Sequence, residues 1–260
     1  MKSKLYQYLI ILYKMKKLTL SIIALAIGIT FSCKKDEETS NKGQVNLTFN
    51  HKVGSDDLEF DSLKYTTAVG HVYEVRNLEY FISNITFNRS NGSEFVIKGP
   101  IYIDAQKSIT LNHSNEIPTG IYESIAVTFG LDSNMNITDT LTSVDESNMS
   151  WPENNGGGYH YMKFEGTYDS LGNSEVNKSY NLHTGAIMGQ PHDFSVTFDN
   201  SAFTLNESGI DLEVSMDLNE WFTNPAEYDF ADYGPMIMMN MAAQNDLKAN
   251  GSSVLSILVK

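Results

Sequence analysis

Apolar and polar residues alternate along most of the chain after residue 44. Val45, Leu47, Phe49, His51 and Val53 occupy every second position, with polar residues between most of them. A period of two is typical of a β-strand with one buried face, so His51 is expected on the buried side. The same pattern predicts further strands at residues 78–88, 94–97, 101–103, 121–129, 159–168, 194–198, 210–218 and 254–259.

A hairpin turn and two short helical segments complete the predicted architecture. Asn91-Gly92 lies between two of the strands and is typical of a β-hairpin. Helical signal is confined to residues 218–223 and 235–248, the second of which opens with a proline and is rich in Ala and Met. We therefore expect one mainly β domain over residues 43–260, an antiparallel β-sandwich with long loops and one or two short helices.

The first 32 residues have the organisation of a cleaved signal peptide. Three lysines precede an apolar run from Leu18 to Phe31, which ends just before the lone cysteine Cys33. The run has 14 residues. That is shorter than the roughly 20 residues a helix needs to span a bilayer. We expect residues 1–32 to be removed rather than retained as an anchor.

The residues around Cys33 indicate lipid attachment. Thr30-Phe31-Ser32-Cys33 resembles the lipobox of bacterial lipoproteins, in which the cysteine is acylated and becomes the mature N-terminus. Residues 33–42 would then form the acylated cysteine and a flexible tether. Their charged run also resembles the acidic export tag of Bacteroidetes surface lipoproteins. The expected location is the outer membrane, held by the lipid on Cys33, on the periplasmic or the cell-surface side.

The composition excludes several classes of function. Loss of residues 1–32 removes five lysines and no acidic residue, which moves the formal net charge from −14 to −19. Such a surface repels phosphates, so no nucleic acid partner is expected. Cys33 is the only cysteine, so its acylation leaves no thiol for disulfides or thiolate metal sites. The chain lacks the motifs of serine hydrolases, nucleotide-binding loops and zinc proteases, and we expect no enzymatic activity.

Histidine and methionine carry the remaining chemistry. All six histidines follow Cys33, and four of the 11 methionines lie within residues 236–241. Imidazole and thioether groups are copper ligands. The methionine run is also explained as core filling, because Met packs well into irregular gaps.

Each histidine has a structural interpretation beside the metal-binding one. His51 and His160, which share their strand sides with apolar residues, can be buried residues satisfied by hydrogen bonds. His113 lies in a polar run and is expected in an exposed loop. His183 and His192 flank a loop with two glycines and either converge on one ion or simply bound that loop.

Several segments occur in an order and spacing that is more specific than a generic sandwich. The most distinctive is Trp151, followed by a glycine-containing loop, Gly158-Tyr159 and then Lys163-Phe164-Glu165-Gly166. The others are residues 45–58, 80–87, 118–131, 182–185 and the tail from Trp221 onward. Together, across nearly all of the mature chain, they resemble the copper-binding MbnP-like family.

This resemblance implies a secreted or periplasmic β-rich protein that binds copper. In characterised relatives a tryptophan is oxidised to kynurenine by a di-haem partner of the cytochrome c peroxidase type. Carried over by motif, the resemblance assigns copper to His51, in the first strand, and His183, in the His-x-Gly motif. His71 and His192 are candidates for a third ligand. His71 falls in the stretch where the modified tryptophan of a relative is expected, and no tryptophan occurs between His51 and Trp151. Trp151 matches a different family tryptophan, which is either functional or structural.

Two hypotheses remain at the level of the sequence. In the first, the protein captures or hands on copper through imidazoles, with a haem protein as its redox partner. In the second, it is a metal-free surface module on the same fold that binds a protein or glycan. The first requires at least two of the four assigned histidines to lie within about 4 Å of a common point, given metal–nitrogen bonds near 2 Å.

Overall fold

Burial alternates along the first strand, as the sequence predicts. In β1 (Lys42–Val53) every second residue from Gly43 to Val53 is buried. The other strands are β2 (Asp56–Asp57), β3 (Tyr65–Thr66), β4 (Val72–Arg89), β5 (Glu94–Asp104), β6 (Asn112–Pro118), β7 (Gly120–Phe129), β8 (His160–Asp169), β9 (Asn177–Gly185), β10 (Phe194–Phe198), β11 (Phe203–Leu205), β12 (Ile210–Asp217) and β13 (Leu255–Val259). The helices are η1 (Ser108–Thr110), α2 (Val144–Ser147), η2 (Glu153–Asn155), η3 (Leu218–Phe222), α3 (Phe230–Tyr233) and α4 (Met241–Val254).

The computed structural model describes residues 41–169 and 177–260. The expected signal peptide, Cys33 and the tether up to residue 40 lie outside the described residues. In the part of the chain that is described, no helix combines the length and apolar character needed to cross a membrane.

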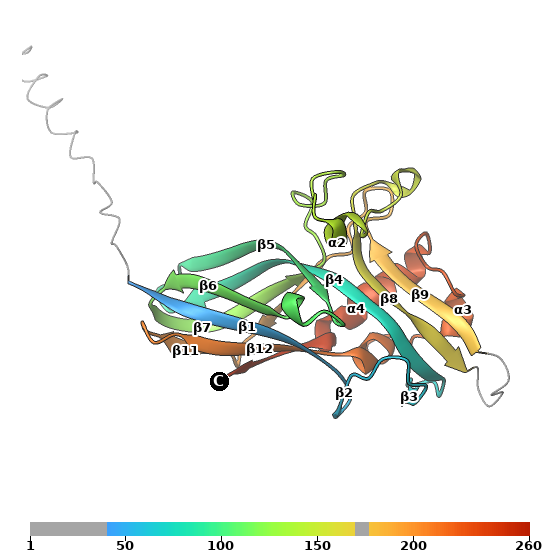
Figure 1. Ribbon diagram of the computed structural model, residues 1–260, viewed down its shortest axis with the longest axis horizontal. Helices are drawn as coiled ribbons and strands as arrows, with labels where there is room; N and C mark the ends of the chain where they lie inside the picture. The colour runs from blue at the N-terminus through green and yellow to red at the C-terminus, as the bar shows by residue number, and fades with distance from the viewer. Residues whose placement is uncertain (1–40, 170–176) are drawn as a thin grey trace, which may run out of the picture. The chain divides into compact units, whose positions relative to one another are not determined.

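The strands form two sheets, which confirms the predicted β-sandwich (Figure 1). The smaller sheet has the order β13-β12-β1-β2, with β6 also paired to β1. The larger sheet has the order β10-β7-β4-β8-β9, and β3, β5 and β11 pair with its members. Most pairs are antiparallel as expected, but β1 and β12 run parallel.

The main core lies on the inner face of the larger sheet, defined as the face that carries Tyr80, Phe164 and Leu182. Over β8 and β9 this face is covered by η3 and α3. The Phe164 ring centroid lies 5.7 Å from that of Phe222, and the Tyr180 centroid lies 4.7 Å from that of Phe230. The two strands that carry the motif residues are therefore backed by a packed aromatic layer.

A second, smaller core lies on the opposite, outer face of the larger sheet. Its buried members are Phe81, Leu131, Met149, Tyr159, Tyr161 and Ala186. Most of them belong to or adjoin residues 131–159, a long segment that we call the outer loop and that includes α2. This loop covers part of the outer face and so creates a second buried environment.

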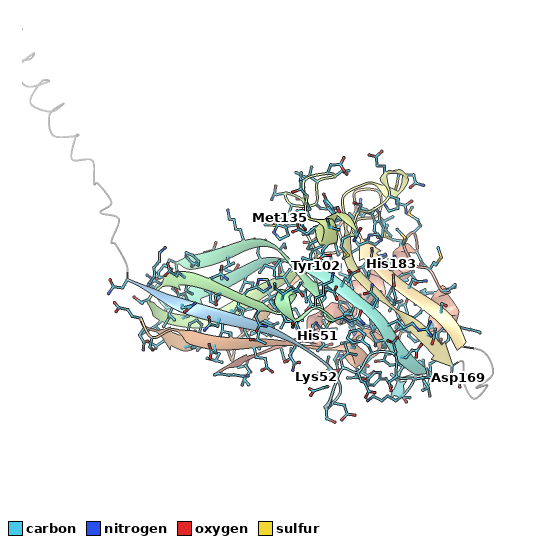
Figure 2. All side chains as sticks on the ribbon, in the orientation of Figure 1. His51, Lys52, Tyr102, Met135, Asp169 and His183 are labelled. Carbon is cyan, nitrogen blue, oxygen red and sulfur yellow. The ribbon has the colours of Figure 1, made fainter. Side chains whose placement is uncertain are left out.

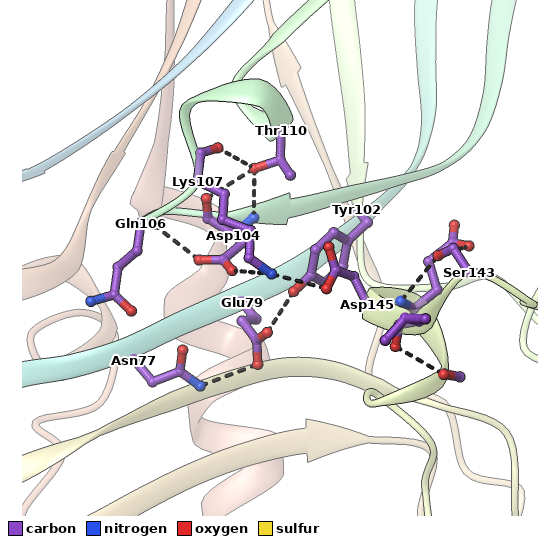
Figure 3. Close-up of polar contacts among 12 residues, drawn as sticks. Asn77, Glu79, Tyr102, Asp104, Gln106, Lys107, Thr110, Ser143 and Asp145 are labelled. Carbon is purple, nitrogen blue, oxygen red and sulfur yellow. Dashed lines mark hydrogen bonds and ion pairs between the residues drawn. The ribbon is translucent and has the colours of Figure 1, made fainter.

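Polar contacts fix the outer loop to the sheet (Figure 3). The Lys107 Nζ lies 3.1 Å from Asp104 Oδ2 and 2.9 Å from Asp145 Oδ1 in α2. Beside them the Tyr102 hydroxyl donates to Glu79, and burial raises the Tyr102 pKa. The Lys107–Asp145 ion pair joins α2 to the segment that follows β5, and the Tyr102–Glu79 hydrogen bond joins β5 to β4.

Three local expectations are corrected by the structure. Helix α4 begins at Met241 rather than 235, because the Asn240 side chain accepts a hydrogen bond from the Ala243 amide and caps the helix there. The segment at residues 101–103 continues β5 instead of forming its own strand. His113 is half-buried in β6, with its Nε2 2.9 Å from the Thr110 carbonyl oxygen, and is not in an exposed loop.

Candidate metal centre

Strand alternation places His183 on the outer face of β9. Tyr180 and Leu182 are buried in the main core, so their side chains point to the inner face. In a strand, neighbouring side chains point to opposite faces. His183 and Asn181 therefore share the outer face.

A β-bulge brings His160 to the same outer face. In the pairing of β8 with β9, the register shifts between His160 and Met162. A bulge inserts an extra residue and redirects the side chains that precede it. Met162 stays in the main core, whereas the ring of His160 contacts those of Trp151 and His183. The expectation that His160 shares a side with Met162 and Phe164 is therefore wrong, because a bulge interrupts the alternation.

The His160 and His183 rings form a close pair, with centroids 4.9 Å apart and planes at 89°. The Nδ1 of His160 lies 2.9 Å from the Met149 carbonyl oxygen, while its buried Nε2 has no hydrogen-bond partner. Burial lowers the His160 pKa to about 4, so the ring is neutral at pH 7. Because Nδ1–H donates to a carbonyl, the unshared electron pair lies on Nε2.

His183 is held by a carboxylate. Its Nε2 lies 2.5 Å from Glu165 Oε1. Lys163 is the residue of β8 that pairs with His183, and Glu165 lies two positions further along β8, on the same face. The hydrogen bond from His183 lowers the Glu165 pKa, so this carboxyl is ionised at neutral pH. A ligating histidine typically uses one ring nitrogen for a carboxylate or carbonyl and the other for the metal. His160 and His183 each have one ring nitrogen engaged in such a hydrogen bond, to the Met149 carbonyl and the Glu165 carboxylate respectively.

Two motifs that are far apart in the sequence meet beside this pair. The buried indole of Trp151 lies with its ring centroid 4.8 Å from that of His160. A Cβ added at Gly185 would lie 2.8 Å from Trp151 Cε3. The glycine of the His-x-Gly motif is therefore required for the close approach of the tryptophan.

His51 lies on the other side of the larger sheet. Its Nε2 is 3.0 Å from the hydroxyl of Tyr80, a member of the main core, and burial lowers the His51 pKa to about 4. Figure 2 shows His51 and His183 at separate places in the molecule. Because His51 faces the inner side of the sheet and His183 the outer side, the structure does not bring these two expected ligands together.

The other two expected ligands have their own partners. His71 Nε2 lies 2.7 Å from Asp229 Oδ1, and its buried Nδ1 has no hydrogen-bond partner, but the rings beside it are those of Tyr168 and Phe230 rather than a second imidazole. His192 Nδ1 lies 2.7 Å from the Gly185 carbonyl oxygen, and burial lowers its pKa. Within residues 41–169 and 177–260, no three His, Cys, Asp or Glu side chains are grouped closely enough to hold a metal ion.

The His160–His183 pair nevertheless suits a metal that accepts few imidazole ligands. Both rings are oriented by hydrogen bonds, and one has a buried nitrogen with no partner. Two imidazoles are suitable ligands for copper, and a thioether can complete the set. Of the residues assigned from the sequence, only His183 belongs to this pair. In the sequence, only the position of His160 just after the Trp151 loop pointed to its role as a ligand. The bulge that turns its side chain to the outer face could not be read from the sequence.

Comparison with known proteins identifies the family. The family model MbnP matches residues 42–240. Among solved structures, MbnP from Methylosinus trichosporium is similar with a TM-score of 0.53 at 11% sequence identity, covering 84% of this chain and 99% of that chain. At this identity the likeness concerns the fold. No match was found among curated protein sequences. The resemblance predicted from the sequence is confirmed.

Proposed function

The chain belongs to the MbnP family, and on that premise we propose that it captures or hands on copper through His160 and His183. The observation that carries this proposal is the unpartnered, buried Nε2 of His160 next to the ring of His183. Leaving a buried polar atom without a partner costs about 1–3 kcal/mol. Coordination of a metal ion would remove this cost.

The chemistry of the two rings supports copper. Burial keeps His160 neutral, so its Nε2 has an electron pair for a metal at neutral pH. Glu165 orients His183 in the way that carboxylates orient metal-bound histidines. Bound copper would supply redox chemistry at this position. The protein's own part is to hold two imidazoles side by side at the edge of the buried outer-loop core.

The setting that we propose for this site is the cell envelope. A lipid on Cys33 would hold the protein at the outer membrane, and a net charge of −19 after removal of residues 1–32 attracts cations. No nucleic acid partner is proposed, for the same reason of charge.

Trp151 is the residue that we propose for oxidation by a di-haem peroxidase-type partner. Its ring contacts that of His160, so a change in the indole would alter the surroundings of the copper ligand directly. Peptide mass spectrometry of the protein isolated from its natural host tests this step. Conversion of Trp151 to kynurenine would support the partner, and unmodified Trp151 throughout would assign it a structural role.

Copper content tests the main proposal. The purified protein is loaded with copper and desalted, and its metal is measured by inductively coupled plasma mass spectrometry. We expect near-stoichiometric copper in the wild type and little in His160→Ala/His183→Ala. His113→Ala removes an imidazole from the smaller sheet and serves as the matched control, which should keep its copper.

Two outcomes would contradict the proposal. If the double variant retains as much copper as the wild type, the ligands lie elsewhere, and His51, His71 and His192 become the next to test. If the wild type retains no copper, the protein is a metal-free surface module on this fold, and its acidic face is the place to look for a partner.

A further inference from the structure

The methionine run of residues 236–241 does not fill the core, although core filling was one interpretation of the sequence. Met236, Met239 and Met241 are 69%, 50% and 39% exposed. Ile237, in the middle of the run, is the residue that enters the main core. Thioether groups at the surface therefore need another explanation.

The first part of this run lies along the edge of β9. The Asn181 amide donates to the Pro235 carbonyl oxygen at 2.9 Å, and Asn181 forms an isolated parallel bridge with Met236. With Ile237 directed to the core, the residues on either side of it point the other way. Met236 and Met238 therefore share the outer face with Asn181 and His183.

These side chains line one cavity. It has a volume of about 220 Å³ and is lined by Asn181, His183, Met236 and Met238. His183 is thus in contact with His160 on one side and borders a thioether-lined cavity on another. The cavity brings an imidazole and two thioethers, from chain segments about fifty residues apart, to one place.

The donor set indicates which ions this cavity would accept. Thioethers are soft, uncharged ligands that favour Cu(I), whereas Zn²⁺ and Cu²⁺ are well served by imidazole and oxygen ligands. No three His, Cys, Asp or Glu side chains are grouped to hold a metal in the described residues. Met236 and Met238 supply thioethers beside His183.

We propose that Met236 and Met238 form, with His183, the soft-metal opening of the copper site and make it selective for a monovalent ion, Cu(I) or Ag(I). This inference rests on the proposed copper function and adds two thioether residues to that site. The two sulfurs discriminate against Zn²⁺ and Cu²⁺, and the exposure of Met236 gives the ion access from solvent.

The test exchanges sulfur for carbon at similar volume. Met236→Leu/Met238→Leu keeps an apolar lining, and Met239→Leu/Met241→Leu removes two sulfurs from the same run outside the cavity. Affinities for Cu(I) are measured anaerobically by competition with a chromogenic Cu(I) chelator, with Ag(I) as a redox-inert probe. Zn²⁺ and Cu²⁺ are titrated separately. Melting of the metal-free variants checks that the fold is intact.

We expect the cavity variant to bind Cu(I) and Ag(I) at least about tenfold more weakly, the order of loss seen when groups around a metal site are removed. Its Zn²⁺ and Cu²⁺ affinities should be unchanged, and the control variant should match the wild type. X-ray absorption at the copper edge should show sulfur scattering in the wild type that is absent from the cavity variant.

Three results would overturn the inference. Unchanged Cu(I) affinity in the cavity variant, with loss in His160→Ala/His183→Ala, would leave the imidazole site standing without a role for sulfur. If the cavity variant loses affinity equally for Cu(I), Ag(I), Zn²⁺ and Cu²⁺, the two methionines do not make the site selective. Absence of any copper binding by the wild type would overturn the copper function itself.

Discussion

His51 and His160 are alike in burial and differ in what their rings contact. They are 6% and 5% exposed, and burial lowers the pKa of each to about 4. On the inner face, His51 Nε2 is paired with the Tyr80 hydroxyl. On the outer face, His160 Nε2 has no partner and lies beside His183 and Trp151. Burial alone therefore does not separate a structural histidine from a candidate ligand, whereas an unsatisfied nitrogen next to a second imidazole does.

The two faces also differ in how they are built. The inner face is a continuous core closed by the smaller sheet, η3, α3 and α4. The outer face is partly covered by a loop that is fixed by a small core of its own and by polar contacts such as that of Lys107 with Asp145. Loops placed on a rigid sheet are the usual location of binding sites. This contrast can be tested on stability as well as on copper.

The largest expected effect is the contribution of His51 to pH-dependent stability. Its pKa is about 4 in the folded protein and near 6.5 when unfolded, so the unfolded chain binds the proton more tightly. Stability from this residue is therefore present above pH 6.5 and is lost as the pH falls toward 4, by about 3 kcal/mol. Denaturant unfolding of wild type and His51→Gln at pH 7 and pH 4 measures it, and equal pH dependence would contradict the burial of a neutral His51.

The next effect is a difference between two matched substitutions at neutral pH. His51→Leu leaves the buried Tyr80 hydroxyl without its partner and should cost about 2 kcal/mol of unfolding free energy. His160→Leu should cost much less in the metal-free protein, because the Met149 carbonyl keeps the hydrogen bond from the His160 amide at 2.6 Å. Chemical denaturation of both variants without metal makes the comparison. A larger loss for His160→Leu would mean that its ring is structural.

The smallest effect concerns the contact between the two outer-face motifs. Gly185→Ala forces the Trp151 ring away, and overpacking of this kind costs roughly 1–3 kcal/mol. We expect about 1 kcal/mol here, with reduced copper binding, because the Trp151 ring also contacts His160. Tryptophan fluorescence reports the displacement of the Trp151 ring, and denaturant unfolding of the variant reports the loss of stability. An unaltered spectrum with full stability would show that the glycine is not needed for this packing.

Much of the fold was readable from the sequence because strands with one buried face reveal themselves by alternation. The residues of β1, β10 and β12 follow this rule closely. Strands β6 and β9 were missed because their sequences, NHSNEIP and NKSYNLHTG, are largely polar. Helix α4 was expected too early because Met and Ala favour helix locally, whereas the segment before Asn240 is held along β9 by backbone contacts.

The candidate site was only partly predictable, for a reason that lies in the strand pairing. His183 was found through its motif, and Trp151 through the loop that follows it. His160 was assigned to the core side because the alternation through Met162 and Phe164 was extended across a bulge. A one-residue change of register reverses the face of every preceding side chain, and no local residue preference encodes it. His51 was paired with His183 because sequence motifs do not say which face of which sheet each residue occupies.

The most direct measurement is NMR of the imidazole nitrogens during anaerobic titration with Cu(I). The account predicts that the signals of His160 Nε2 and a ring nitrogen of His183 shift together as copper is added, while those of His51 and its hydrogen bond to Tyr80 stay unchanged. Shifts at His51 with no change at His160 would contradict it, and would place the metal on the inner face of the sheet.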